Sequence, residues 1–334
     1  MRWSTPISSL RLGACWLLVL LAPGARAQQE LLPYARECAE KIGPIPAFDC
    51  TKGTRVPITV NGKVPATYVP QMTCDRPSLL PPGAGENTDG QCIPESRALV
   101  LRDDGKVQIS AYCRQKKIRP ANTYLYDEVD LISHNVETGS TCWFQALAPN
   151  PLSADKGLDG RRVPPPEEVT PPAGKPAAKD FWNTPAKTAS GQCGSCHDSD
   201  PFMYSPLIGQ TGQMPRDPLG LYANDIGEDF KKWPKPVALS TRGNTCTGCH
   251  RIGSQHTCKT AMYETVGLYS EDLGKYLDSW ARVYPNSHWM PPGLSMSKEQ
   301  WEATYRGSID ALARCCENPT APGCIVTPIT GITP

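Results

Sequence analysis

Short runs in which apolar and polar residues alternate occupy much of the segment from residue 28 to 150. A period of two is typical of β-strands that bury one face. Asn61 and Gly62 separate two of these runs, and Asp103–Gly105 separates two others; both are turn sequences that favour hairpins. The strands predicted in this way are Ile58–Val60, Lys63–Val69, Ala98–Arg102, Val107–Tyr112, Val129–Ile132 and Thr141–Phe144.

The apolar residues of the C-terminal part follow a helical period instead. One helix is predicted behind Ser270, a suitable N-cap, and a second behind Ser297, which forms a capping-box pattern with Gln300 three residues later. The apolar faces consist of Leu273, Tyr276, Leu277 and Trp280 in the first helix and of Trp301, Tyr305, Ile309 and Leu312 in the second.

Residues 151–179 separate these two regions and are rich in proline, with glycines and paired charges between the prolines. Such a composition favours extended linkers. The predicted fold class is therefore α+β: a disulfide-stapled, β-rich domain at 28–150, the linker at 151–179, and a mainly α domain at 180–334. The linker either keeps the β-rich domain away from the C-terminal domain or lays it across that domain, and the sequence leaves both open.

Residues 1–27 have the features of a secretory signal peptide. Two arginines lie before or beside a short apolar core, Trp16–Ala22, and Ala25–Ala27 matches an A-x-A cleavage site. The core is too short to span a bilayer, so we expect no transmembrane segment and export to the periplasm of a bacterial envelope. Leu12–Cys15 resembles a lipoprotein box but precedes the apolar core instead of following it, so lipid anchoring is the less favoured alternative.

Two C-x-x-C-H pentapeptides, Cys193–His197 and Cys246–His250, carry the candidate chemistry. This is the attachment sequence of c-type haem: two thiols add to the porphyrin vinyl groups, and the imidazole that follows ligates the iron. We therefore predict two covalently bound haem c groups. The cofactor-binding residues are Cys193, Cys196, Cys246 and Cys249, and the iron ligands are His197 and His250.

A disulfide, a zinc site and a redox dithiol are the alternatives for each C-x-x-C pair. Zinc needs two further ligands at suitable spacing. For each motif, the other C-x-x-C-H motif is the only C-x-x-C pair in the sequence that could supply them. A thioredoxin-like site needs a strand before the motif and a helix after it, whereas small and polar residues flank Cys193–His197 on both sides. Covalent haem is therefore the favoured interpretation.

The other cysteines indicate a disulfide framework. Of 15 cysteines, Cys15 lies in the signal peptide and four belong to the haem motifs, so ten remain, an even number suited to an oxidising compartment. Vicinal Cys315 and Cys316 do not bond to each other easily, so one is expected to pair with Cys324 and the other with Cys258. Near neighbours supply the other predicted pairs: Cys38–Cys50, Cys74–Cys92 and Cys113–Cys142.

Residues 244–316, less than a quarter of the chain, resemble a class I cytochrome c. The resemblance rests on Cys246–His250 and on the loop around Met290-Pro291 between two predicted helices. In that family a Met-Pro loop at this position supplies the sixth iron ligand, so the resemblance implies that Met290, 40 residues after His250, is the distal ligand of haem 2. His288 lies two residues earlier and is the alternative distal ligand, because residues two apart in an extended loop share a face.

The sixth ligand of haem 1 has no counterpart in that family, because only 48 residues, 198–245, separate the two motifs. Met203 is the candidate for the distal ligand of haem 1. Met214, His256, His288 and an open coordination site are the alternatives. His134 lies between two predicted strands and is expected to be an ordinary polar loop residue, with a role as haem ligand as its alternative.

Charge and motifs narrow the function. The net charge of +1 arises from 34 basic and 33 acidic residues, which argues against nucleic-acid binding. We expect an electron-transfer protein that passes single electrons between redox protein partners, and we assign no catalytic residue. The alternatives are a dihaem oxidoreductase, peroxidase-like or acting on a small anion, with haem 1 as the substrate site, and a docking protein whose β-rich domain recognises a partner complex.

Overall fold

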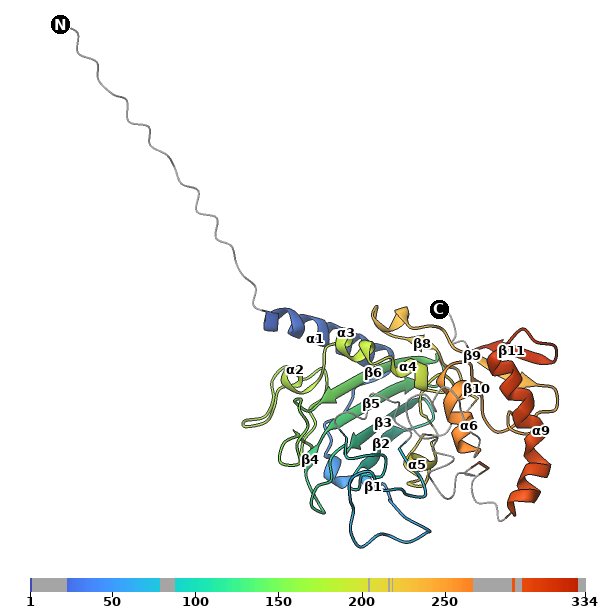
Figure 1. Cartoon of the computed structure of the whole chain (residues 1–334). Helices are drawn as coiled ribbons and strands as arrows, with labels where there is room; N and C mark the ends of the chain where they lie inside the picture. Colours follow the sequence, from blue (N-terminus) through green and yellow to red (C-terminus); the bar gives the residue numbers. More distant parts are fainter. Residues whose placement is uncertain are drawn as a thin grey trace.

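A six-stranded sheet forms the centre of the chain in a computed structural model (Figure 1). The structure describes residues 1, 23–78, 88–203, 205–215, 217, 219–266, 290–291 and 296–329. The sheet order is β1-β2-β3-β5-β6-β8, and all neighbours are antiparallel except the parallel pair β6 and β8. The strands are β1 (Thr54–Arg55), β2 (Arg97–Asp103), β3 (Val107–Arg114), β5 (Glu128–Asn135), β6 (Ser140–Leu147) and β8 (Asn224–Asp225).

A second, three-stranded sheet lies to the right of the first in Figure 1, together with the long helix α9 (Lys298–Glu317). Its order is β10-β9-β11, with β9 at Val237–Thr241, β10 at Ile252–Gly253 and β11 at Cys324–Pro328. A small two-stranded sheet pairs β4 (Leu125–Tyr126) with β7 (Leu158–Asp159). The remaining elements are α1 (Pro23–Lys41), η1 (Cys50–Lys52), α2 (Ala178–Phe181), α3 (Pro185–Ser190), α4 (Cys193–Cys196), α5 (Pro206–Gly209), η2 (Phe230–Lys232), η3 (Thr257–Ala261) and α6 (Met262–Thr265).

Most of the predicted strands are present. The hairpin around Asp103–Gly105 is formed by β2 and β3, and Gly105 adopts a φ of 82°, as its turn requires. The two later runs are β5 and β6. Asn61 and Gly62 have φ angles of 51° and 73°, which fits the expected type I′ turn, but the flanking residues form an isolated bridge and not two strands.

The second predicted helix is confirmed as α9. Ser297 accepts a hydrogen bond from the backbone N–H of Gln300, and the Gln300 side chain accepts one from the backbone of Ser297, so the capping box is complete. Trp301, Ile309 and Leu312 are buried as predicted. The first predicted helix, with its apolar face from Leu273 to Trp280, lies outside the described residues.

Helix α1 is an element that the strand pattern did not predict within the segment 28–150. Its Tyr34 is buried against the central sheet: the hydroxyl donates to the Trp143 carbonyl at 3.2 Å and accepts from the Trp143 N–H at 2.8 Å. The Cys38–Cys142 disulfide adds a covalent link between α1 and β6. Residues 2–22, which include most of the expected signal peptide, lie outside the described residues.

The proline-rich segment 151–179 packs along the central sheet. Val163 is fully buried and pairs with Phe48 in a β-bridge, and Pro164 accepts a hydrogen bond from the Trp182 indole at 2.9 Å. One hydrophobic core runs from Leu31 through the sheet to Ile329. The β-rich part and the C-terminal part therefore pack directly against each other.

Five disulfides join ten cysteines. The predicted Cys74–Cys92 pair is confirmed, and so is the division of Cys315 and Cys316 between Cys324 and Cys258. The pairs Cys38–Cys50 and Cys113–Cys142 are wrong, because sheet pairing and α1 bring distant residues together. The disulfides are Cys38–Cys142, Cys50–Cys113, Cys74–Cys92, Cys258–Cys316 and Cys315–Cys324.

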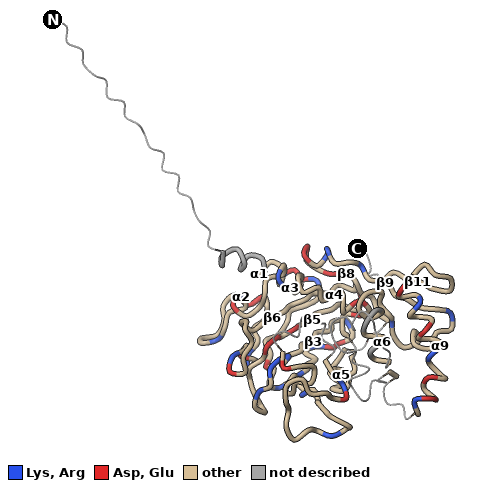
Figure 2. The backbone as a smooth tube through the Cα atoms, viewed as in Figure 1, with Lys and Arg blue, Asp and Glu red and all other residues tan. Residues whose placement is uncertain are grey.

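Basic and acidic residues are interspersed along the backbone (Figure 2). Within the described ranges, none of the helices is long and apolar enough to cross a membrane.

Candidate functional site

The thiols of the two C-x-x-C-H motifs stand apart from the other described cysteines. All ten others are joined in disulfides, whereas Cys193, Cys196, Cys246 and Cys249 are free. In a chain that oxidises its other cysteines in pairs, free thiols at both motifs are the donor set that covalent haem attachment requires. Burial raises the pKa of the Cys193 thiol to about 12, so this thiol stays protonated.

The first motif forms the short helix α4, which begins after Gln192 in the left-handed region at φ 51°. Gly194 lies directly against the indole of Trp233: a Cβ at this position would lie 2.7 Å from Trp233 Cε3. Trp233 is itself held by a 2.9 Å hydrogen bond from its indole N–H to the Ala189 carbonyl. A larger residue at position 194 would therefore push α4 away from the core.

His197 has a defined tautomer. Its Nδ1 lies 2.9 Å from the Pro201 carbonyl, which only accepts, so Nδ1 carries the proton and Nε2 keeps its lone pair. Burial lowers the pKa of His197 to about 4, so the ring is neutral. The Trp143 ring packs edge-on against the imidazole at 5.2 Å between centroids, and the Tyr222 hydroxyl donates to the His197 carbonyl at 2.6 Å.

His250 in the second motif has the same arrangement, with Nδ1 3.1 Å from the Arg251 carbonyl. The start of this motif is anchored to α9, because Asn244 Nδ2 donates to the Ser308 carbonyl at 2.9 Å. His250 also lines a cavity of about 400 Å³, a size within the range of pockets for organic ligands. Other residues of its wall are Leu221, Leu239, Thr247, Arg251 and Ile329.

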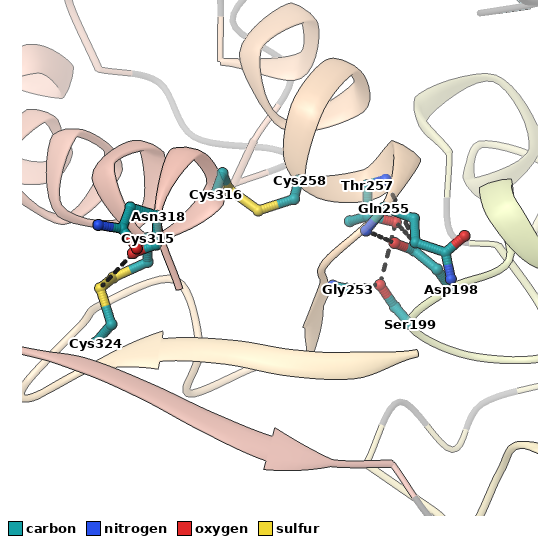
Figure 3. Close-up of a disulfide and its surroundings, with 10 residues drawn as sticks. All are labelled: Asp198, Ser199, Gly253, Gln255, Thr257, Cys258, Cys315, Cys316, Asn318 and Cys324. Carbon is teal, nitrogen blue, oxygen red and sulfur yellow. Dashed lines mark hydrogen bonds between the residues drawn. A yellow bond between two sulfur atoms is a disulfide. The ribbon is translucent and has the colours of Figure 1, made fainter. Parts of the chain in front are cut away.

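The residues that follow the two motifs are hydrogen-bonded to each other (Figure 3). Asp198 accepts from the backbone N–H of Gln255 at 2.5 Å and from the N–H of Thr257 at 3.3 Å, and the Thr257 hydroxyl also donates to it. Ser199 Oγ accepts from the Gly253 N–H at 3.0 Å and donates to the Thr257 hydroxyl at 3.2 Å. We call these five residues the inter-motif bridge.

A second link between the motifs is an ion pair between Arg251 and Asp200. Both side chains are largely buried, and Arg251 also donates to the Gly220 carbonyl at 2.6 Å. Burial raises the pKa of Asp200 to about 7, and the Arg251 guanidinium opposes this shift.

Met290 lies against a hydrophobic cluster that Cys246 of the second motif also borders. The cluster consists of Val266, Trp301 and Ile309, and the Met290 carbonyl accepts a 2.7 Å hydrogen bond from the Trp301 indole of α9. Met290 and Cys246 thus border the same hydrophobic cluster, and the role of Met290 as distal ligand stays a prediction. His288, the alternative distal ligand, lies outside the described residues.

The described candidates for the distal position of the proposed haem 1 lie outside the strands and long helices. Met203 and Met214 are half-buried in loops, and His256 is half-buried immediately before η3. Burial lowers the pKa of His256. No contact in the described part of the chain selects one of these three side chains, so Met203 stays a prediction.

His134 is not a loop residue, and this expectation was wrong. It lies in β5, is 1% exposed, and its Nδ1 is 3.0 Å from the Thr141 hydroxyl. Burial lowers the pKa of His134 to about 4, although hydrogen bonds with the backbone of Ser140 and Leu221 oppose the shift. It is a neutral, hydrogen-bonded core residue.

The guanidinium groups of Arg251 and Arg114 lie beside the motifs, and both are ion-paired, Arg251 with Asp200 and Arg114 with Glu128 and Asp130. Arg251 Nε, next to His250, has no hydrogen-bond partner among the described residues, and neither has Arg114 Nε, whose guanidinium acts electrostatically on Cys196 and His197. Paired free thiols and an available histidine Nε2 at each motif fit covalent haem.

Trp143, Trp233, Tyr222 and Arg114 surround the first motif, and sequence reasoning did not single out any of them. Trp143 was recognised only as part of a strand, and the others lie outside any motif. Their proximity to Cys193–His197 arises from sheet packing, which leaves no local signal. No family model matches the chain, and comparisons with curated proteins and with solved structures found no match.

Proposed function

We propose that the chain is an exported dihaem c-type cytochrome that transfers single electrons between redox protein partners. The observation that carries this proposal is the selective pairing of cysteines. Five disulfides join the ten described cysteines outside the two C-x-x-C-H motifs, and the four thiols of the motifs are free.

Each residue of the two motifs has a role in this proposal. Cys193 and Cys196 hold one haem c and Cys246 and Cys249 the other, through thioether bonds. In each histidine Nδ1 donates its proton to a backbone carbonyl, so Nε2 keeps its lone pair and is the atom that ligates the iron. Each bound haem supplies a one-electron ferric–ferrous couple.

Met290 is proposed as the distal ligand of haem 2, and Trp301 positions it by holding its carbonyl. A thioether stabilises ferrous iron more than a second imidazole does, which raises the reduction potential. Packing against the cluster of Val266, Trp301 and Ile309 holds the side chain in place without relying on the weak iron–sulfur bond alone.

The carrier function is favoured over a dihaem oxidoreductase by the partners of the two histidines. A carbonyl acceptor at Nδ1 adds no charge beside the iron ligand, whereas a carboxylate there would add negative charge and promote chemistry on a bound substrate. Five disulfides are compatible with a compartment outside the cytoplasm, and we propose the periplasm.

The experiment that tests the proposal starts from the chain expressed in a bacterial envelope with a c-type haem maturation system. The intact mass should exceed that of the mature chain by two haems. Cys193→Ala with Cys196→Ala should remove one haem, and Cys246→Ala with Cys249→Ala the other. A protein that matures without covalent haem would refute the proposal.

Carbon monoxide distinguishes the carrier from the oxidoreductase. A carrier has two low-spin haems, and its ferrous form does not bind carbon monoxide, because both sixth positions are occupied. Rapid carbon monoxide binding at one haem, with a high-spin ferric fraction, would overturn the simple carrier and favour the enzyme with haem 1 as its substrate site.

A further inference from the structure

The inter-motif bridge connects the backbone on the proximal side of one proposed haem with that of the other. Asp198 follows the iron ligand His197 directly, and Gly253 lies three residues after His250. The five residues are joined by five hydrogen bonds, in which the carboxylate of Asp198 takes part in three. Both histidines are therefore attached to one hydrogen-bonded unit.

Asp198 is the centre of this unit. Its side chain is 0% exposed, and both carboxylate oxygens accept: Oδ2 from Gln255, and Oδ1 from the backbone and hydroxyl of Thr257. A buried carboxylate is expensive unless donors surround it. The Gln255 N–H, the Thr257 N–H and the Thr257 hydroxyl meet that requirement. Asp198 is therefore stable in this position only when the segment after the second motif lies next to it.

Gly253 shows how closely the segments that follow the two motifs approach each other. A Cβ at this position would overlap the Asp198 carboxylate, so the residue must be glycine for the bridge to form. Its φ angle is not in the left-handed region, so the requirement is steric and comes from the approach itself.

The bridge continues into the part of the chain that holds Met290. Cys258 follows Thr257 directly and is joined by a disulfide to Cys316 in α9, as Figure 3 shows. Helix α9 carries Trp301, whose indole holds the Met290 carbonyl. A continuous path of covalent and hydrogen bonds thus leads from the proximal side of haem 1 to the loop of the proposed distal ligand of haem 2.

We propose that Asp198 is a positioning residue that fixes the separation and orientation of the two haems and thereby sets the rate of electron transfer between them. The inference rests on the proposed function, since it presupposes both haems. Asp198 acts through Gln255 and Thr257 on the backbone that carries both iron-ligating histidines.

Asp198→Asn is the variant that tests this role. An asparagine has one oxygen, so the Gln255 N–H or the Thr257 donors lose their acceptor and face an amide N–H₂ instead. Thr257→Val, which removes one hydroxyl and preserves the shape, is the milder second variant. Both are compared with the wild type as mature protein carrying two haems.

Asp75→Asn is the matched control. Asp75 is likewise buried and accepts hydrogen bonds from the Thr59 hydroxyl and from the backbone N–H groups of Asn61 and Gly62, but it closes the turn at Asn61 and Gly62 instead. Its loss should reduce thermal stability to a similar extent without touching the bridge.

Two measurements separate positioning from stability. The first is the magnetic dipolar interaction between the two ferric haems in electron paramagnetic resonance, which depends steeply on their separation and orientation. The second is the rate of electron equilibration between the haems after rapid partial reduction. Asp198→Asn should broaden or weaken the interaction and slow equilibration several-fold, Thr257→Val should do so less, and Asp75→Asn should leave both unchanged.

The outcomes distinguish the two proposals. Equal dipolar interaction and equal rates in Asp198→Asn and the wild type, with only a lower melting temperature, would show that Asp198 is merely structural. If Asp198→Asn does not fold, Thr257→Val decides in the same way. A mass without two haems would refute the proposed function itself, before either measurement is made.

Discussion

At the scale of single residues, the histidines of the two C-x-x-C-H motifs make the same kind of hydrogen bond. Nδ1 of His197 is hydrogen-bonded to the carbonyl of Pro201, four residues later. Nδ1 of His250 is hydrogen-bonded to the carbonyl of Arg251, the next residue. The backbone therefore sets the tautomer, and no side chain is needed for it. Their surroundings differ: His197 packs against Trp143, whereas His250 lines a cavity.

Met290→Ala tests the proposed distal ligand. Without the thioether, haem 2 loses its sixth ligand, so the weak sulfur-to-iron absorption band of the ferric protein should disappear and the ferrous protein should bind carbon monoxide at one haem. Met296→Ala, which removes an exposed methionine six residues later, is the control and should leave the spectrum unchanged. Persistence of the band in Met290→Ala would contradict the assignment.

Asp130 gives a prediction for pH dependence. Burial, followed by the charge of Glu128, raises the pKa of Asp130 to about 7, so the folded state holds its proton more tightly than the unfolded chain does. Its contribution to stability is therefore full below about pH 4 and is lost as the pH rises through about 7. Asp130→Asn removes that loss and should stabilise the protein relative to the wild type at pH 8, with little effect at pH 4.

Denaturant unfolding at both pH values measures this difference. Asp104→Asn is the control with the opposite sign, because hydrogen bonds from Val107 and then Arg102 lower the pKa of Asp104 to about 2. That variant should lose stability near neutral pH. A stability difference between Asp130→Asn and the wild type that is the same at pH 4 and pH 8 would contradict the prediction.

At the scale of elements, α9 organises the second motif. Its capping box starts the helix, Ser308 anchors Asn244, and Trp301 holds Met290. The Cys258–Cys316 and Cys315–Cys324 disulfides tie its last turn to η3 and to β11. A single helix thus connects the bridge, the three-stranded sheet and the proposed distal ligand.

Removal of the Cys258–Cys316 disulfide by two Cys→Ser substitutions should affect haem 2 as well as stability. We expect a loss of about 2–4 kcal/mol in the free energy of unfolding, together with increased carbon monoxide binding as α9 loosens its hold on Met290. The same change at Cys74–Cys92, which closes a shorter loop in the N-terminal part, should lower stability only. Equal carbon monoxide binding in both variants would count against this role of α9.

At the scale of the whole molecule, the N-terminal and C-terminal parts share one core. Tyr34 stacks on Phe230 with ring centroids 5.1 Å apart, β8 pairs with β6, and Trp143 packs against His197. The first motif therefore depends on residues from the β-rich part for its packing.

Cooperative unfolding follows from the shared core. Chemical unfolding followed by tryptophan fluorescence and by haem absorption should give coincident transitions, because the rings at the first motif belong to the common core. Residues 180–334 expressed alone should not form a stable first haem site, since they lack Trp143 and Arg114. Two well-separated transitions would show instead that the two parts fold independently.

The sequence alone determined the features that depend on neighbours along the chain. Strands β2, β3, β5 and β6, the turn at Asn61 and Gly62 and the capping box of α9 follow from periodicity and turn chemistry, because a few consecutive residues contain the whole signal. The spacing of Cys193–His197 and Cys246–His250 likewise identified the candidate haem sites.

Only the tertiary structure decided which distant segments meet. Cys38 pairs with Cys142 and not with Cys50, His134 is buried in a strand, and 151–179 packs along the sheet, because sheet registry and shared burial bring together residues that leave no mutual signal in the sequence. The same holds for Asp198 and Thr257, which are 59 residues apart in the sequence. A buried carboxylate needs hydrogen-bond donors around it, and only the folded chain places these donors beside Asp198.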